Sequence, residues 1–214
     1  NAFENSGIET LVIPKSVVEL SDGWCNNTKY LNNVIILSGN EHFKYLDENH
    51  QIIVSNKYSK NNKYNNLIFS SRNIKEINIP SFIQTIDSYS FDHCKQITNI
   101  NFNDDSQLYT IRSSAFSYSS IQSIKIPNNV KTILNLAFAY CSILKKIEFG
   151  KKSQLNHVDS SAFSKSPLTH LIIPKSVKNA EFKDCFKLIS VEYLGEELYF
   201  YENSYQSNNI TLIS

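Results

Sequence analysis

Apolar residues recur along this chain in a fixed order. The segments that follow the order apolar-x-x-apolar-x-apolar are Ile8–Ile13, Ile74–Ile79, Ile97–Phe102, Ile121–Ile126, Leu144–Phe149 and Leu168–Ile173. A proline follows four of them, at positions 14, 80, 127 and 174. The later segments start at 74, 97, 121, 144 and 168, so the spacing alternates between 23 and 24 and two coils form a unit of 47 residues. Such a period indicates repeated structural units.

Each repeat carries two further apolar columns. The first holds the pairs Val17 and Leu20, Ile83 and Ile86, Leu108 and Ile111, Val130 and Ile133, and Leu155 and Val158. The second is a series of phenylalanines: Phe3, Phe91, Phe116, Phe138, Phe163 and Phe182. Alanine precedes four of these phenylalanines, at positions 2, 115, 137 and 162. A small residue beside a large one suits the narrow interior of a coil, because the ring fills space that its neighbour leaves free.

A single segment of this kind could be any strand, but several columns in register predict a solenoid. One coil cannot bury its own apolar edge, so stacked coils are expected to share a continuous core. The whole chain, residues 1–214, is expected to form one solenoid domain.

The full pattern, L-x-x-I-x-I-P-x-x-V-x-x-I-x-x-x-A-F-x-x-C, resembles the BspA-like leucine-rich repeats of bacterial and protist surface proteins. The resemblance covers residues 1–37 and 74–194. It implies an α/β-type repeat solenoid with coils of about 23 residues, a parallel β-sheet on the concave face and little regular helix. It also implies a role in adhesion or host interaction, although a fold alone does not fix a function.

Two parts of the chain depart from the period. Residues 38–73 are expected to form an irregular coil with an inserted β-hairpin, whose strands are 52–54 and 67–69. The polar tip between them is either a plain surface loop or a partner-binding loop, and its candidate contacts are Lys57, Tyr58, Lys60, Lys63 and Tyr64. Residues 195–214 are expected to be a C-terminal cap or a truncated coil.

The strands also predict a binding surface, because side chains between the apolar ones face solvent. On the concave face we expect a row of candidate contacts: Glu76, Asn78, Asn99, Asn101, Ser123, Lys125, Lys146, Glu148 and His170. About nine coils stacked at ~4.8 Å give a face on the order of 40 Å long, enough for a protein partner. This face has few aromatic anchors, so binding is expected to be weak and multivalent, or anchored by the hairpin tyrosines.

Three cysteines, Cys94, Cys141 and Cys185, each lie three residues after a column phenylalanine, and Ser119 and Ser166 take this place in the coils between. Neighbouring cysteines are thus two coils, roughly 10 Å, apart. A disulfide requires Cα atoms within about 7 Å, so buried thiols are expected instead.

Other functions lack support in the sequence. Lys and Arg number 21 against 20 Asp and Glu, a net charge of +1 that argues against a nucleic-acid partner. No apolar run approaches the ~20 residues of a membrane helix. We find no catalytic, nucleotide-binding or zinc motif, so we expect a non-enzyme with no cofactor and no metal site.

Two functions from different classes remain open. The first is a cell-surface or extracellular module that binds a host-cell or extracellular-matrix protein. The alternative is a cytoplasmic scaffold that organises other proteins. The chain begins at Asn1 and contains no methionine, so we expect it to be a segment of a longer protein.

Overall fold

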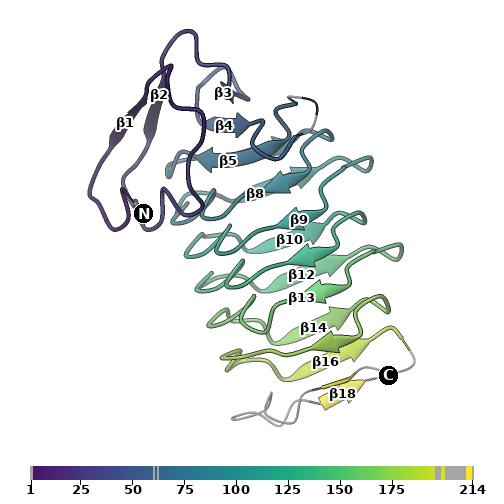
Figure 1. The fold of residues 1–214 in the computed structure, drawn as a ribbon. Coiled ribbons are helices and arrows are strands. Elements are labelled where there is room, and N and C mark those ends of the chain that lie inside the picture. The colour runs from purple at the N-terminus through teal and green to yellow at the C-terminus, as the bar shows by residue number, and fades with distance from the viewer. Residues whose placement is uncertain (1, 60, 62, 196–198, 201–210, 214) are drawn as a thin grey trace.

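The chain winds into a stack of coils. The computed structural model describes residues 2–59, 61, 63–195, 199–200 and 211–213. The coils follow one another from the N-terminal strands at one end to β18 at the other (Figure 1). Strands and turns account for the regular structure of the described residues, which contain no helix. The predicted repeat solenoid is confirmed.

Each coil contributes a long strand to one face, and the six coils between residues 76 and 200 also contribute a two-residue strand to the other. The long strands are β1 (Thr10–Ile13), β2 (Asn33–Ile36), β6 (Glu76–Ile79), β8 (Asn99–Phe102), β10 (Ser123–Ile126), β12 (Lys146–Phe149), β14 (His170–Ile173), β16 (Ser190–Tyr193) and the three-residue β18 (Thr211–Ile213). The short strands are β7 (Thr85–Ile86), β9 (Thr110–Ile111), β11 (Thr132–Ile133), β13 (His157–Val158), β15 (Asn179–Ala180) and β17 (Tyr199–Phe200). We call the side formed by the long strands the long-strand face; it corresponds to the predicted concave sheet.

The alternating repeat length corresponds to two kinds of strand neighbour. Across the 23-residue steps, the long strands form parallel hydrogen-bonded pairs, β6 with β8 and β10 with β12. Across the 24-residue steps, β8 lies beside β10 and β12 beside β14, but these strands share no ladder. The short strands bridge the gaps, because β7, β9, β11 and β13 pair in one continuous series. The two faces therefore hold the stack together by different hydrogen-bond patterns.

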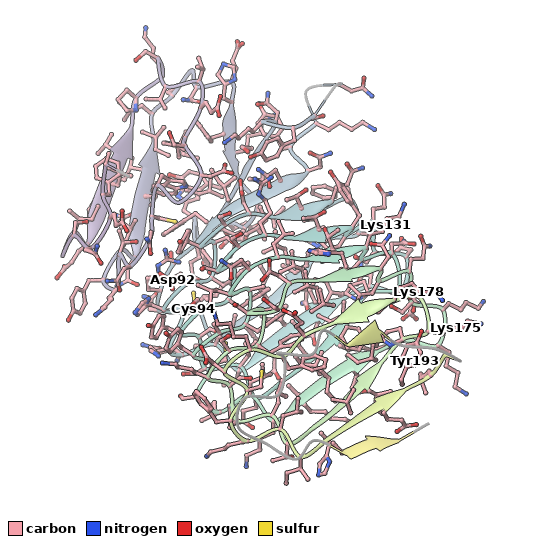
Figure 2. The ribbon with its side chains drawn as sticks, turned by 60° about the horizontal axis from the view of Figure 1, so that its bottom comes forward. Asp92, Cys94, Lys131, Lys175, Lys178 and Tyr193 are labelled. Atoms are coloured by element: carbon pink, nitrogen blue, oxygen red, sulfur yellow. The ribbon has the colours of Figure 1, made fainter. Side chains whose placement is uncertain are left out.

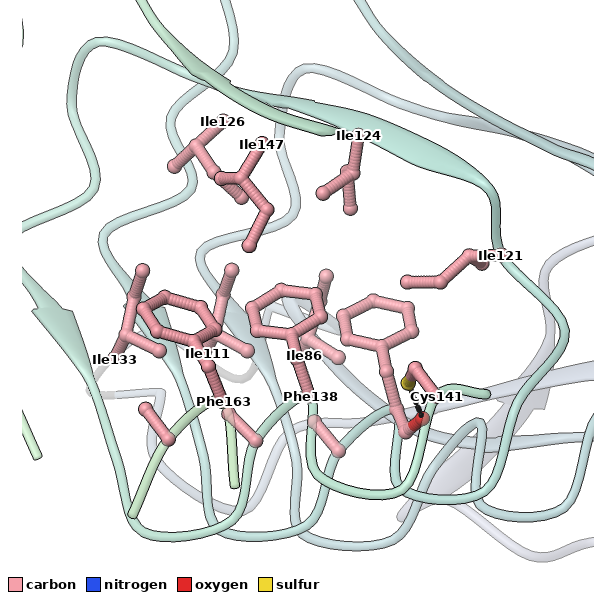
Figure 3. Close-up of a cluster of buried hydrophobic side chains, with 14 of the residues drawn as sticks. Ile86, Ile111, Ile121, Ile124, Ile126, Ile133, Phe138, Cys141, Ile147 and Phe163 are labelled. Carbon is pink, nitrogen blue, oxygen red and sulfur yellow. Dashed lines mark hydrogen bonds between the residues drawn. The ribbon is translucent and has the colours of Figure 1, made fainter. Parts of the chain in front are cut away.

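The phenylalanine column fills the centre of the stack. Phe91, Phe116, Phe138 and Phe163 are buried, and the centroids of successive rings lie 4.9, 5.1 and 5.8 Å apart. This distance is close to the ~4.8 Å between neighbouring strands, so each ring stacks on the next without disturbing the coils. Figure 3 shows Phe138 and Phe163 side by side, among isoleucines from the strands of both faces.

The turns around these rings form a third ladder. The backbone N–H of Phe91 donates to the carbonyl of Ala115 at 2.7 Å, and that of Phe116 donates to Ala137 at 2.8 Å. Residues two positions after each ring have left-handed backbones, as in His93 with a φ of 58° and Tyr118 with a φ of 57°. Non-glycine residues adopt this conformation at a cost of roughly 1 kcal/mol or more, so the stacked turns must compensate for it.

Residues 38–73 contain the predicted hairpin and one strand more. The antiparallel strands β4 (Ile52–Ser55) and β5 (Asn66–Ser70) confirm the hairpin, and β3 (Phe43–Tyr45) adds to β4 as a third antiparallel strand that was not predicted. β4 and β5 are buried on both faces. Ile52 and Leu67 pack with the main core, whereas Ile53 and Phe69 join a second cluster with the N-terminal coils. The core is thus divided in two, which differs from the continuous core that the repeat predicts.

Arg72 joins the two halves. Its side chain is buried, and its guanidinium donates to backbone carbonyl oxygens of Cys25, Thr28, Ser70, Tyr89 and Ser90 at 3.1–3.3 Å. A buried charge is costly unless its donors are satisfied, and here carbonyl oxygens from three separate segments satisfy them. Arg72 therefore links the N-terminal coils to the rest of the stack.

In the C-terminal segment, strand pairing continues in the same sense. β17 pairs in parallel with β15, and β18 pairs in parallel with β16. This arrangement is that of a further coil. The other residues of this predicted cap or truncated coil, 196–198, 201–210 and 214, lie outside the described residues.

All four cysteines lie in the core, as predicted for Cys94, Cys141 and Cys185. Cys25, Cys94, Cys141 and Cys185 are all buried, and no disulfide is present in the described structure. The Sγ of Cys141 donates to the carbonyl of Phe116 at 3.0 Å, and that of Cys185 to Phe163 at 3.5 Å. Burial raises the pKa of Cys25 to about 11 and that of Cys141 to about 12. The thiols therefore remain protonated near neutral pH.

We predict that Phe138→Ala destabilises the fold by about 3–5 kcal/mol, because it leaves a cavity between two stacked rings. Urea unfolding followed by circular dichroism measures the change. Ile143→Ala serves as the matched control, since Ile143 is 38% exposed. Equal destabilisation by the two substitutions would show that the ring column does not support the stack.

We also predict that a thiol reagent at pH 8 fails to label the native protein and labels all four cysteines in urea. Buried, protonated thiols are inaccessible and poorly nucleophilic. An added surface cysteine, Asn101→Cys, is the positive control and should react at once. Rapid native labelling of Cys94 or Cys141 would contradict the packing described above.

Candidate protein-binding surfaces

The long-strand face presents the predicted side chains to solvent. The four strands β6, β8, β10 and β12 alternate exposed and buried residues at their first three positions. The predicted contacts are all exposed: Glu76, Asn78, Asn99, Asn101, Ser123, Lys125, Lys146, Glu148 and His170. Their placement is as predicted, while their role in binding stays a prediction.

These side chains form two columns that run across the strands. In one column Asn78 lies opposite Asn101 and accepts a hydrogen bond from its amide at 3.0 Å. Farther along, Lys146 Nζ lies 2.7 Å from Glu148 Oε1, and this contact lowers the pKa of Glu148. Lys125 is opposite Glu148 on the neighbouring strand and lowers its pKa further. Charge is thus concentrated in the middle of the face, where solvent screens it.

At the C-terminal end of the face, His170 and Ser190 are hydrogen-bonded at 2.6 Å between Nδ1 and Oγ. A catalytic serine requires a histidine that a third group orients. Among the described residues no carboxylate is hydrogen-bonded to His170, so the pair resembles a cross-strand contact more than a nucleophile and its base. The described residues also contain no group of three His, Cys, Asp or Glu side chains that could hold a metal.

The tip of the hairpin is folded against the first coil. Lys57 Nζ lies 3.0 Å from Glu19 Oε1 and 2.9 Å from Asp22 Oδ1, and the Tyr58 hydroxyl donates to Asp22 at 3.0 Å. The Tyr64 hydroxyl donates to the Glu41 carbonyl. Of the predicted tip contacts, Lys63 is exposed and Lys60 lies outside the described residues. Tyr58 remains 42% exposed.

Asp22 connects the tip with the solenoid. Arg112 Nη2 lies 2.6 Å from Asp22 Oδ2, and Arg112 Nε lies 3.1 Å from Asp87 Oδ1. Partial burial would raise the pKa of Asp22, but the contacts with Lys57 and Arg112 outweigh burial and lower it. The carboxylate therefore stays ionised at neutral pH and joins three segments that are far apart in the sequence.

A column of aromatic side chains on the turns was not predicted. The rings of His93, Tyr118 and Tyr140 stack with centroids 4.6 and 4.5 Å apart. Lys95 Nζ lies 5.7 Å from the Tyr118 ring, and Lys165 Nζ lies 5.5 Å from the Tyr140 ring. Each of these residues lies two positions after a phenylalanine of the buried column. This spacing is the sequence signal from which the aromatic column could have been predicted. This aromatic column supplies the tyrosine surface that the long-strand face lacks.

Lysines gather along another edge of the stack. Lys131, Lys175 and Lys178 project on the side away from Asp92 and Cys94 (Figure 2). All three are exposed and follow the long strands of their coils. Three lysine side chains therefore lie on this side of the stack.

Two cavities open beside β6. The larger has a volume of about 610 Å³ and is lined mainly by amide and charged side chains, including Asn49, Gln51, Asn73, Glu76, Asn78 and Gln96. The second, of about 270 Å³, shares Asn49, Gln51, Glu76 and Asn78 with it. A smaller cavity of about 150 Å³ lies between β8 and β10, at one of the gaps in the long-strand ladder.

Comparison with known proteins agrees with this architecture. The fold is similar to that of the pneumococcal vaccine antigen PcpA, with a TM-score of 0.73 and 20% sequence identity over 97% of this chain and 56% of that one. It is also similar to a leucine-rich repeat protein from Eubacterium ventriosum, with a TM-score of 0.64 and 25% identity over 87% of this chain and 49% of that one. The chain thus spans about half the length of each of these proteins. No curated protein matches it.

The repeats themselves match a family model. Six copies of the BspA type leucine rich repeat region cover residues 1–64 and 62–189. These ranges include both the regular coils and the inserted strands. The chain belongs to the BspA-type leucine-rich repeat family.

Proposed function

We propose that this chain is a non-enzymatic binding module of a cell-surface or secreted protein, and that it contacts a host-cell or extracellular-matrix protein through the long-strand face. The observation that carries the proposal is the row of exposed side chains on rigid, paired strands. Because β-strands fix the direction and spacing of these side chains, little ordering is needed when a partner binds.

The chain's membership of the BspA-type leucine-rich repeat family supports a protein-interaction role. Leucine-rich repeats present extended surfaces of this kind. PcpA, to which the fold is similar, is a vaccine antigen, and this supports the surface setting. In the described part of the chain no helix has the length and apolar character that a membrane crossing requires.

The face favours many weak contacts over a few strong ones. Its exposed residues are mostly small or polar, and the charged residues Lys125, Lys146 and Glu148 lie at its centre. Exposed charges of this kind affect the rate and specificity of association more than its strength. Tyr58 and the aromatic column are the candidates for stronger anchors, because tyrosine is enriched at interface hot spots.

We predict that Lys125→Glu combined with Lys146→Glu slows association and weakens saturable binding to intact host cells and to immobilised matrix proteins. The substitutions reverse the charge at the centre of the face without touching the core. Flow cytometry and surface plasmon resonance measure the change. The double substitution Lys151→Glu and Lys152→Glu is the matched control, since both lysines are exposed on the turn that follows β12 and are not among the candidate contacts.

If the face variant binds every matrix protein and cell type as well as the wild-type chain does, the long-strand face is not the binding surface. If the wild-type chain binds nothing extracellular, the alternative of an intracellular scaffold gains support.

A further inference from the structure

β6 is paired along only one of its edges. The N–H of Thr98 donates to the carbonyl of Lys75 at 2.7 Å, and the register places Ile77 opposite Ile100 in the parallel pair with β8. Backbone groups of successive residues point to opposite edges of a strand. The N–H and C=O groups of Glu76 and Asn78 therefore point away from β8. No described strand pairs with β6 along this edge.

The free edge of β2, on the side away from β1, is partly closed. The N–H of Ile36 donates to the Tyr45 hydroxyl at 2.8 Å, and this hydroxyl donates to the carbonyl of Val34 at 2.9 Å. One side chain from β3 thus satisfies two of the outward backbone groups of β2, the N–H of Ile36 and the C=O of Val34. Within the described residues no side chain does the same for Glu76 or Asn78. Exposed edges are often blunted in this way, but among the described residues the outward edge of β6, like that of β1, has no strand or side chain paired with it.

Glu76 and Asn78, whose outward backbone groups are unpaired, both line the larger cavity. Across it lie Asn49 and Gln51, in the turn and loop before β4, and the side chains of Asn73 and Gln96 add further amides. A volume of about 610 Å³ lies within the range of known ligand sites. Amide side chains both donate and accept hydrogen bonds, as a peptide group does. A chain lying in this cavity would meet complementary groups on both sides.

We infer that the open edge of β6 and its amide-lined cavity bind an extended segment of a partner protein, which adds to β6 as a further strand. Alternating N–H and C=O groups at the repeat of a β-strand are matched by another polypeptide backbone. The inference rests on the protein-binding role proposed above, but it uses a different surface from the charged centre of the face.

Pro80 limits the length of the site. It is the next residue after Asn78 whose backbone would point to the open edge, and proline has no N–H to donate. The edge therefore offers the donors of Glu76 and Asn78 and ends there. This arrangement favours a short segment and prevents the addition of a long strand.

The test uses a phage-displayed library of short linear peptides selected on the 214-residue chain. We expect enriched peptides whose affinity, measured by fluorescence polarisation, falls about ten- to hundredfold in Asn78→Pro, because a carbonyl of the bound peptide loses its donor. Proline is tolerated at this position of β6, since the N–H of Asn78 takes no part in the ladder with β8.

Asn101→Pro is the matched control. Asn101 is opposite Asn78 on β8, and its N–H points toward β10; both substitutions remove the hydrogen bond between the two side chains. This variant should bind the peptides like the wild-type chain. Methylation of alternate backbone nitrogens of the peptide provides a second measurement that leaves the protein unchanged, and it should abolish binding.

The inference is overturned if no peptide is enriched, or if both Asn78→Pro and backbone methylation leave the affinity unchanged. The variant with Lys125→Glu and Lys146→Glu separates this result from the broader proposal. Retained peptide binding with weakened matrix binding in that variant supports two distinct surfaces. Matrix binding without any peptide binding removes only the β6 site.

Discussion

The distance between successive coils is the constraint on which the rest of the molecule depends. It must suit parallel strands at ~4.8 Å and stacked phenylalanine rings at the same time. Ring centroids 4.9 and 5.1 Å apart meet both needs. The alanine before most rings lets the turns approach closely enough for their backbones to form hydrogen bonds from coil to coil. Since every turn position then repeats at this distance, like residues form columns, and the aromatic column is one consequence.

The candidate sites lie where this regularity is interrupted. β3, β4 and β5 separate the N-terminal coils from the others, and β6 is left without a neighbour on one edge. The N-terminal coils remain attached through Arg72, whose donors all go to oxygen atoms, and through the ionised Asp22. Local departures from an otherwise consistent pattern are expected at functional sites, because they cost stability that the regular part supplies. The insertion therefore creates both a junction and an accessible edge.

Much of the fold follows from periodicity. The apolar columns predicted the long strands, the phenylalanine stack, the buried thiols and the exposed side chains of the face, since each depends only on position within a coil. The alternating 23 and 24 spacing was visible as well, but its meaning as paired and unpaired strands depends on hydrogen bonds between coils. The sequence alone could not predict which neighbouring strands pair, because it does not show where in a 24-residue coil the additional residue lies.

Other features depend on contacts between distant segments or on unusual backbones. β3 was missed because Phe43–Tyr45 has no repeat to mark it, and Tyr45 acts through a hydroxyl that caps β2. The hairpin tip looked like a free polar loop, yet Asp22, outside the hairpin, holds Lys57 and Tyr58 in place. The aromatic column was missed because its residues occupy left-handed turns, where glycine or asparagine is the usual signal.

The two proposed surfaces differ in the physics by which they would bind. The charged centre of the face is exposed and screened, so it favours rapid and reversible encounters. The edge of β6 offers directional backbone hydrogen bonds beside a partly enclosed cavity. There, less water surrounds each hydrogen bond, so the bond is electrostatically stronger. A partner that engaged both surfaces at once would bind more tightly than either contact allows, because the second contact becomes intramolecular. A rigid stack suits this mode, since the phenylalanine column fixes the distance between the two surfaces.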